Sequence, residues 1–212
     1  MIIQKVIRGI GNITEDEANK MFSEGILCNW WRKVKALPQI KKIERLTETN
    51  LEWHQNRFTE QDPDFGNQPF CENTPFISTT AGCIERDTFN HINIQHRAWF
   101  EALRFATKYW TTPGYLFYCD LFVLSKKSVA YEQYSEELRE LNLYHAYSHF
   151  HPEGEVTAKI VIPGVQIEKW EYYDLTSLVG ITQGNNQPSP VNSRINHNYI
   201  QASEISNLRA LI

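Results

Sequence analysis

Apolar and polar residues alternate with a period of two in several segments of the chain, and this pattern is typical of half-buried β-strands. Glycines or a Pro-Gly pair bound most of these segments. One of them is unusually rich in aromatic residues, which favour strands. The predicted strands are residues 2–10, 76–79, 115–124, 156–162 and 165–173.

Other segments have the period of an amphipathic helix. Thr14 is followed by three acidic residues and, later, by Gly25, so a capped helix is predicted between them. A more polar helix is predicted at about residues 44–58, and apolar positions at helical spacing indicate another within 85–110, broken near its start. A short helix is predicted at 132–141.

Helices lie mostly early in the chain and strands mostly late, which favours the α+β class over alternating α/β. A chain of 212 residues suits one domain with an appended tail. We expect the main domain to cover residues 1–180. We expect an irregular tail over 181–212, because the composition there turns to Asn, Gln, Pro and Ser.

Composition narrows the class of protein. The formal net charge is −4 without a long basic block, so binding to nucleic acid or to an anionic membrane is not expected. We find no apolar run long enough for a signal peptide or a membrane span and expect a soluble chain. The four cysteines lack the spacing of a zinc or disulfide framework, and Cys119 is expected to be buried.

Residues 148–164, SHFHPEGEVTAKIVIPG, hold the densest group of candidate chemical residues. His149, His151 and Glu155 match a fragment of the cupin metal motif, although its upstream glycine and its later proline-glycine-histidine portion are missing. Glu153 and Glu155 instead suggest a carboxylate pair, because residues i and i+2 of a strand lie on one side, about 6.6 Å apart. Such a pair can divide acid and base roles, yet it can also be the solvated entrance of an ordinary strand.

Three motifs together resemble a known family. Arg8 lies near the end of the first predicted strand, Ser78-Thr79-Thr80 follow Phe76-Ile77, and Glu153-Gly154-Glu155 open a late strand. This order resembles the mono-ADP-ribosyltransferases of the arginine–serine–glutamate class, especially the cholera-toxin and pertussis-toxin catalytic chains. The segments at 7–27 and 146–170 carry the densest likeness.

The resemblance implies a fold of two packed antiparallel or mixed β-sheets that form an NAD cleft with flanking helices. It implies transfer of ADP-ribose from NAD, the co-substrate, to an arginine of a target protein. Arg8 would hold the NAD phosphate, Ser78 would position the catalytic carboxylate, and Thr79 and Thr80 would support the site. Glu155 would stabilise the positive charge that develops on the ribose as nicotinamide leaves.

Glu153 would orient and deprotonate the acceptor, and in this family a glutamate at this position accompanies arginine as the acceptor. The loop at 144–152 would recognise the target, with Tyr144, Tyr147 or Phe150 in contact with it. Thr80 replaces the usual final serine but keeps a hydroxyl group. The aromatic residue that contacts nicotinamide is not assigned, and Phe89 is one candidate. No metal is expected under this reading.

Alternative functions remain open at the level of sequence. An NAD glycohydrolase would use water as the acceptor, and a nucleobase-modifying transferase would share the fold. A cupin-like protein would bind a metal through His149, His151 and Glu155. The family implies a toxin or effector that is secreted or translocated and acts in the cytosol of a target cell.

Overall fold

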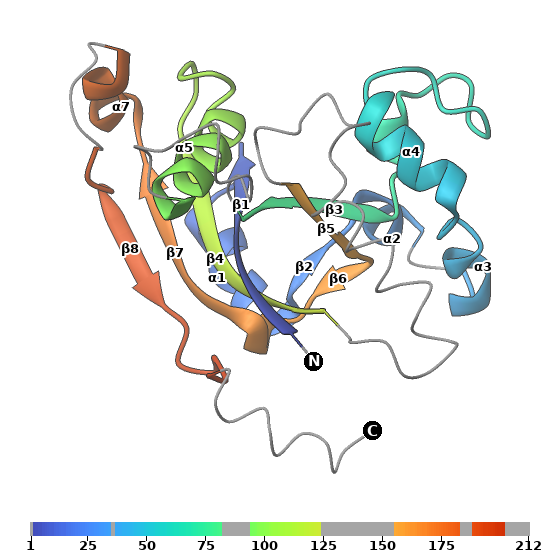
Figure 1. The fold of residues 1–212 in the computed structure, drawn as a ribbon, viewed down its shortest axis with the longest axis horizontal. Coiled ribbons are helices and arrows are strands. Elements are labelled where there is room, and N and C mark those ends of the chain that lie inside the picture. Colours follow the sequence, from blue (N-terminus) through green and yellow to red (C-terminus); the bar gives the residue numbers. More distant parts are fainter. Residues whose placement is uncertain (1, 35–36, 82–93, 124–154, 183–187, 202–212) are drawn as a thin grey trace.

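A six-stranded antiparallel sheet forms the centre of the computed structural model, which describes residues 2–34, 37–81, 94–123, 155–182 and 188–201 (Figure 1). The strand order is β5-β3-β1-β4-β7-β8. These strands are β5 (Glu155–Lys159), β3 (Phe76–Thr80), β1 (Ile2–Gly11), β4 (Gly114–Val123), β7 (Ile167–Tyr173) and β8 (Asn192–Ile195). A separate two-stranded sheet pairs β2 (Ile26–Leu27) with β6 (Val161–Ile162).

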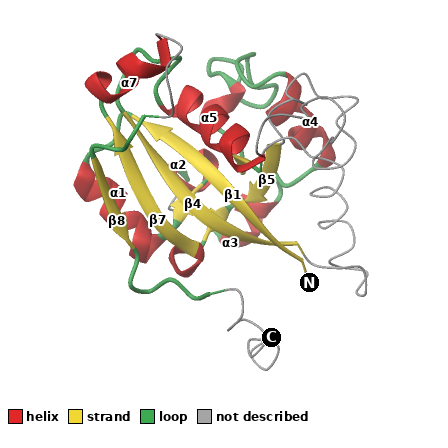
Figure 2. Cartoon of the chain, turned by 60° about the vertical axis from the view of Figure 1, so that its left-hand side comes forward, coloured by secondary structure: helices red, strands yellow, loops and turns green. Residues whose placement is uncertain are grey.

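Helices cover both faces of the large sheet (Figure 2). One face packs against α5, while the other packs against residues of α1 and α2. The α-helices are α1 (Glu15–Glu24), α2 (Asn29–Lys33), α3 (Gln39–Ile43), α4 (Glu48–Asn56), α5 (Ile94–Ala106) and α7 (Leu175–Thr182). Short 3₁₀ helices are η1 (Phe70–Glu72) and η4 (Gly164–Gln166). The predicted α+β class is confirmed.

Glycines let α5 lie directly on the sheet beside the strand that carries Arg8. A Cβ atom on Gly9 would overlap the carbonyl oxygen of Ala102, and one on Gly114 would lie 2.7 Å from the carbonyl oxygen of Ala106. The ten-residue ladder between β1 and β4 runs without interruption beneath this helix. Arg8 is therefore built into a rigid part of the sheet.

The first helix forms as the sequence predicts. Thr14 caps α1, and a capping box joins it to Glu17. Gly25 follows the helix at φ 78°, a backbone conformation that few other residues adopt readily. The predicted strands at 2–10, 76–79 and 115–124 are confirmed as β1, β3 and β4, and Cys119 is buried as expected.

One strand prediction is wrong in its extent. The alternation over residues 156–162 predicted a single strand, but Ile160 has φ 63° and interrupts it. The chain leaves the large sheet after β5, and β6 then pairs with β2 in the smaller sheet. The strand predicted at 165–173 begins at Ile167, because η4 precedes it.

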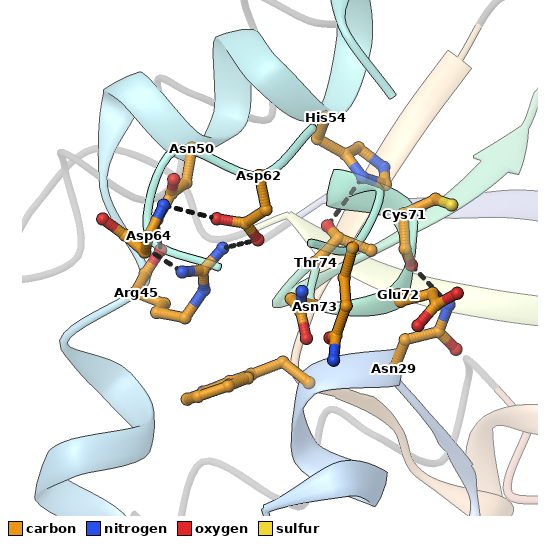
Figure 3. Close-up of polar contacts among 12 residues, drawn as sticks. Asn29, Arg45, Asn50, His54, Asp62, Asp64, Cys71, Glu72, Asn73 and Thr74 are labelled. Carbon is orange, nitrogen blue, oxygen red and sulfur yellow. Dashed lines mark hydrogen bonds and ion pairs between the residues drawn. The ribbon is translucent and has the colours of Figure 1, made fainter. Parts of the chain in front are cut away.

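The polar helix predicted at 44–58 is α4, and the structure adds α2 and α3 before it. An ion-pair network ties these elements together (Figure 3). Arg45 donates to the carboxylates of Asp62 at 2.8 Å and Asp64 at 2.7 Å, and its guanidinium lies 5.2 Å from the ring centroid of Trp30. This network fixes the loop that leads from α4 to β3.

The predicted tail is partly regular. Residues 192–195 form β8, which pairs with β7 as the sixth strand, because backbone pairing satisfies a polar segment that has little apolar pattern. The boundary between residues 180 and 181 stays a prediction. The helix predicted at 132–141 lies outside the described residues, as does the part of the 85–110 helix before residue 94. None of the described helices is long and apolar enough to cross a membrane.

Candidate active site

Consecutive strands of the large sheet bring together three predicted residues that are far apart in sequence. Arg8 is on β1, Ser78 on β3 and Glu155 on β5, and β3 lies between the other two strands. In the β3–β5 ladder Thr80 is opposite Glu155 and Ser78 is opposite Thr157. Because side chains alternate along a strand, these four lie on the same face.

Arg8 is held by the neighbouring strand. Its Nη1 atom donates to the backbone carbonyl of Ser78 at 2.7 Å. Its Nε atom is buried and has no hydrogen-bond partner among the described residues. Burial lowers the pKa of Arg8 to about 10, and the nearby carboxylate of Glu155 opposes this shift. The guanidinium thus remains charged at neutral pH, and one of its donors is unpaired within the described part of the chain.

Glu155 is a buried carboxylate with 8% of its surface exposed. The hydroxyl group of Ser78 hydrogen-bonds it, and Thr157 Oγ1 donates to its Oε1 at 3.4 Å. Burial raises the pKa of Glu155, while these two hydrogen bonds and the charge of Arg8 lower it in part. A carboxylate held in this way has little solvation and few alternative orientations.

His54 completes the cluster and was not predicted from sequence. It comes from α4, is 4% exposed, and its Nε2 atom lies 2.9 Å from Ser78 Oγ and 3.7 Å from Glu155 Oε1. Its Nδ1 atom lies 2.8 Å from Thr74 Oγ1 (Figure 3). Burial, with a smaller contribution from Arg8, lowers the pKa of His54 to about 3, so the ring is neutral at pH 7.

Thr79 and Thr80 support the strands that carry the site. Thr79 Oγ1 donates to the carbonyl of Val156 at 2.5 Å and so links β3 to β5. Thr80 is buried opposite Glu155. Neither threonine lines the cavity described next.

A cavity of about 240 Å³ opens beside these groups. Arg8, Ser78 and His54 line it, and Phe58 gives it an aromatic wall, with the ring 5.4 Å from that of His54. Arg32 also lines it and brings a second cation. Phe58, like His54, was missed in the sequence, where no motif distinguishes either from a packing residue.

A larger hollow of about 650 Å³ lies on the α5 side of the sheet and contains none of the predicted site residues. Its polar groups satisfy one another: Glu171 accepts from Tyr118 and Lys169, both at 2.6 Å. Asp120 accepts from Tyr199 at 2.6 Å. The smaller cavity is therefore the candidate active site.

Several predicted residues lie outside the described part of the chain. These are Glu153, Tyr144, Tyr147, Phe150 and Phe89, together with His149 and His151 of the metal alternative. Within the described ranges, no group of three or more His, Cys, Asp and Glu side chains is placed to hold a metal ion.

Two solved structures are similar to this chain in fold. One is named EcPltA, with 15% identity and a TM-score of 0.47 over 94% of this chain and 89% of that chain. The other is the catalytic domain of the mosquitocidal toxin from Bacillus sphaericus, with 14% identity and a TM-score of 0.44. That match covers 96% of this chain and 59% of the other.

No protein-family model matches the chain, and no curated protein matches it in sequence.

Proposed function

We propose that this chain is a mono-ADP-ribosyltransferase that transfers ADP-ribose from NAD to an arginine of a target protein and releases nicotinamide. The residues of the site carry the proposal. Arg8, Ser78 and Glu155 meet on three consecutive strands, and the first two line a cavity. A cation, a positioning hydroxyl group and a buried carboxylate are the groups that this reaction needs.

The donors of Arg8 fit a dinucleotide phosphate. Its Nη1 atom is engaged with Ser78, while its buried Nε atom lacks a partner among the described residues. An unmet buried donor on a cation favours an anionic acceptor, and a guanidinium binds phosphate well. Arg8 would therefore hold the NAD diphosphate and brace β3 at the same time.

Glu155 would act on the reacting ribose. When the bond between nicotinamide and the ribose C1′ breaks, nicotinamide leaves with the electron pair and positive charge develops on the sugar. A fixed carboxylate stabilises this charge more effectively in a buried site than in water. Ser78 and Thr157 would keep the carboxylate in place through their hydrogen bonds.

Glu153 would complete the transfer. An arginine side chain is fully protonated at pH 7 and is a poor nucleophile until it loses a proton. As a guanidinium nitrogen bonds to C1′, its proton would pass to the carboxylate of Glu153, two residues before Glu155. Delivery as a secreted or translocated effector, which the family resemblance implies, belongs to the same proposal.

The test follows NAD turnover by the wild-type chain, Glu155→Gln, Glu153→Gln and Glu60→Gln. Glu60 is exposed and serves as the matched control. Release of nicotinamide and transfer of label to polyarginine are measured in parallel. We expect Glu155→Gln to lose both by roughly 100-fold or more, as expected when a group that stabilises developing charge is removed. We expect Glu153→Gln to lose transfer and keep hydrolysis, and Glu60→Gln to match the wild type.

Other results would change the assignment. Nicotinamide release by the wild type without label on any protein acceptor would indicate an NAD glycohydrolase. Label transfer to a nucleobase and not to polyarginine would indicate the nucleobase-modifying alternative. A wild-type chain that neither binds nor cleaves NAD would overturn the proposal.

A further inference from the structure

The ring of His54 lies between two hydroxyl groups, one at each nitrogen. Thr74 Oγ1 is 2.8 Å from Nδ1, and Ser78 Oγ is 2.9 Å from Nε2. A neutral imidazole carries one proton and has one lone pair, so it donates to one hydroxyl group and accepts from the other. The partners of these hydroxyl groups determine which nitrogen carries the proton.

On the Ser78 side, the carboxylate of Glu155 favours one direction for the hydrogen bond between Ser78 and His54. An ionised carboxylate only accepts, so the charge of Glu155 favours a Ser78 hydroxyl group that donates its single proton toward it. Ser78 Oγ is then left to accept a proton from His54 Nε2. The 3.7 Å distance between Nε2 and Glu155 Oε1 agrees with this assignment, since an N–H attracts a carboxylate and a lone pair repels it.

On the Thr74 side, a backbone group favours the hydrogen bond in which Thr74 donates to His54. The N–H of Phe76 donates to Thr74 Oγ1 at 3.2 Å, so this oxygen is already an acceptor. Its proton remains available for the lone pair of His54 Nδ1. Thr74 is 2% exposed, which leaves little room for water to take the place of this hydroxyl group.

We propose that Thr74 is a positioning residue that holds His54 as the Nε2–H tautomer. The hydrogen bonds along this row of four residues then all run in one direction. Thr74 donates to His54, His54 donates to Ser78, and Ser78 donates to Glu155. His54 acts as a donor that fixes Ser78, and it is not a base for the acceptor. The reverse tautomer would draw the Ser78 proton toward the ring and away from Glu155.

The effect on catalysis rests on the proposed function, whereas the tautomer does not. With the row in this order, Ser78 keeps donating to Glu155 and holds the carboxylate in one orientation for the ribose. Loss of the Thr74 proton would therefore lower the rate of the chemical step more than the affinity for NAD.

The first experiment measures the tautomer in the unliganded wild-type chain. Long-range ¹H–¹⁵N correlations of a sample labelled in its seven histidines show which ring nitrogen carries the proton. The signals of His54 are identified by their absence in His54→Gln. We expect Nε2–H at pH 7, and Nδ1–H overturns the proposal. NAD is not used, so a failed transferase assay cannot be mistaken for this result.

The second experiment compares Thr74→Val, Thr74→Ser and Thr107→Val. Valine keeps the shape of threonine and removes the hydroxyl group. Thr107 is the matched control, because it is also buried, donates to one carbonyl and accepts from a backbone N–H, but lies at the end of α5. Both valine variants therefore lose similar hydrogen bonds, and only one of them touches His54.

We expect Thr74→Val to lose the Nε2–H preference of His54 and to lower kcat roughly tenfold with little change in KM, as for one lost hydrogen bond. Thr74→Ser should restore both, and Thr107→Val should keep the wild-type tautomer. If Thr74→Val retains Nε2–H, Thr74 does not set the tautomer and the proposal is wrong. If Thr74→Val does not fold, the wild-type measurement still overturns the proposal when it finds Nδ1–H.

Discussion

Arg8 and Ser78 are joined by a hydrogen bond of 2.7 Å between Nη1 of the guanidinium and the backbone carbonyl of Ser78. The bond joins the cation of β1 to the strand whose hydroxyl group contacts Glu155. Any ligand that binds Arg8 is thereby coupled to the position of β3. The same arginine thus contacts β3 through one nitrogen, while another nitrogen has no hydrogen-bond partner among the residues that the structure describes.

The planar guanidinium group of Arg8 is expected to contribute to NAD binding beyond its positive charge. Arg8→Lys keeps a cation and loses the planar group that can bind Ser78 and a phosphate together. We expect KM for NAD to rise roughly 10- to 100-fold, in line with one or two lost hydrogen bonds to a charged group. Steady-state kinetics provide the measurement. Arg194→Lys makes the same change at an exposed position of β8 and should leave KM unchanged; a similar rise in both variants would contradict the assignment.

Burial of His54 makes the fold sensitive to acid. Its pKa is lowered from 6.5 to about 3, so the unfolded chain takes up the proton first as the pH falls. The stabilising contribution is fully present above pH 6.5 and is lost progressively toward pH 3. It amounts to roughly 5 kcal/mol over that range.

We therefore expect His54→Gln to show a shallower decline in the free energy of unfolding between pH 6.5 and 4. Urea denaturation at several pH values measures this decline. His197→Gln removes an exposed imidazole and should keep the steep decline of the wild type. An unchanged decline in His54→Gln would mean that other groups cause the acid sensitivity.

Much of the candidate site was predictable because its residues lie on β-strands, whose pattern is visible in the local sequence. The alternation in β1, β3 and the start of β5 is visible over a few residues, and Arg8, Ser78 and Glu155 stand at positions that a family motif marks. The structure places them on adjacent strands. Their roles in catalysis stay predictions, and so does the role of Glu153.

His54 was not predictable from its surroundings in the sequence. Its polar contacts are with Thr74, Ser78 and Glu155, which are 20 or more residues away, and α4 has only a weak apolar face. The interruption of the predicted strand at Ile160 was missed for the same reason. Its local pattern is that of a strand, but β6 pairs with β2 more than 130 residues earlier in the chain. Tertiary contacts of this range leave little local signal.

The buried carboxylate of Glu155 is expected to reduce the stability of the fold. Burial raises the pKa of Glu155, so its stabilising contribution is present at low pH and is lost as the pH rises. At pH 7 the ionised group opposes folding, and a neutral amide of the same shape relieves this cost. We expect Glu155→Gln to raise Tm at pH 7 by roughly 2–4 °C, and the gain to vanish at pH 4.

Thermal denaturation at the two pH values, followed by circular dichroism, tests this expectation. Glu60→Gln, at an exposed position, should change stability by no more than about 0.5 kcal/mol at either pH. A lower Tm for Glu155→Gln at pH 7 would show that Arg8 and the two hydroxyl donors more than offset the burial of the charge.

The Arg45 network offers a direct comparison of a buried and an exposed partner on one guanidinium. The side chain of Asp62 is fully buried, while that of Asp64 is 61% exposed, and both contact Arg45 at similar distances. Asp62→Asn removes the buried counter-charge of Arg45, leaves only the exposed one, and is expected to cost roughly 3–5 kcal/mol of unfolding free energy. Asp64→Asn should cost less than about 1 kcal/mol, because water screens the exposed pair. Urea denaturation at pH 7 measures both, and equal losses would show that burial does not control the strength of these ion pairs.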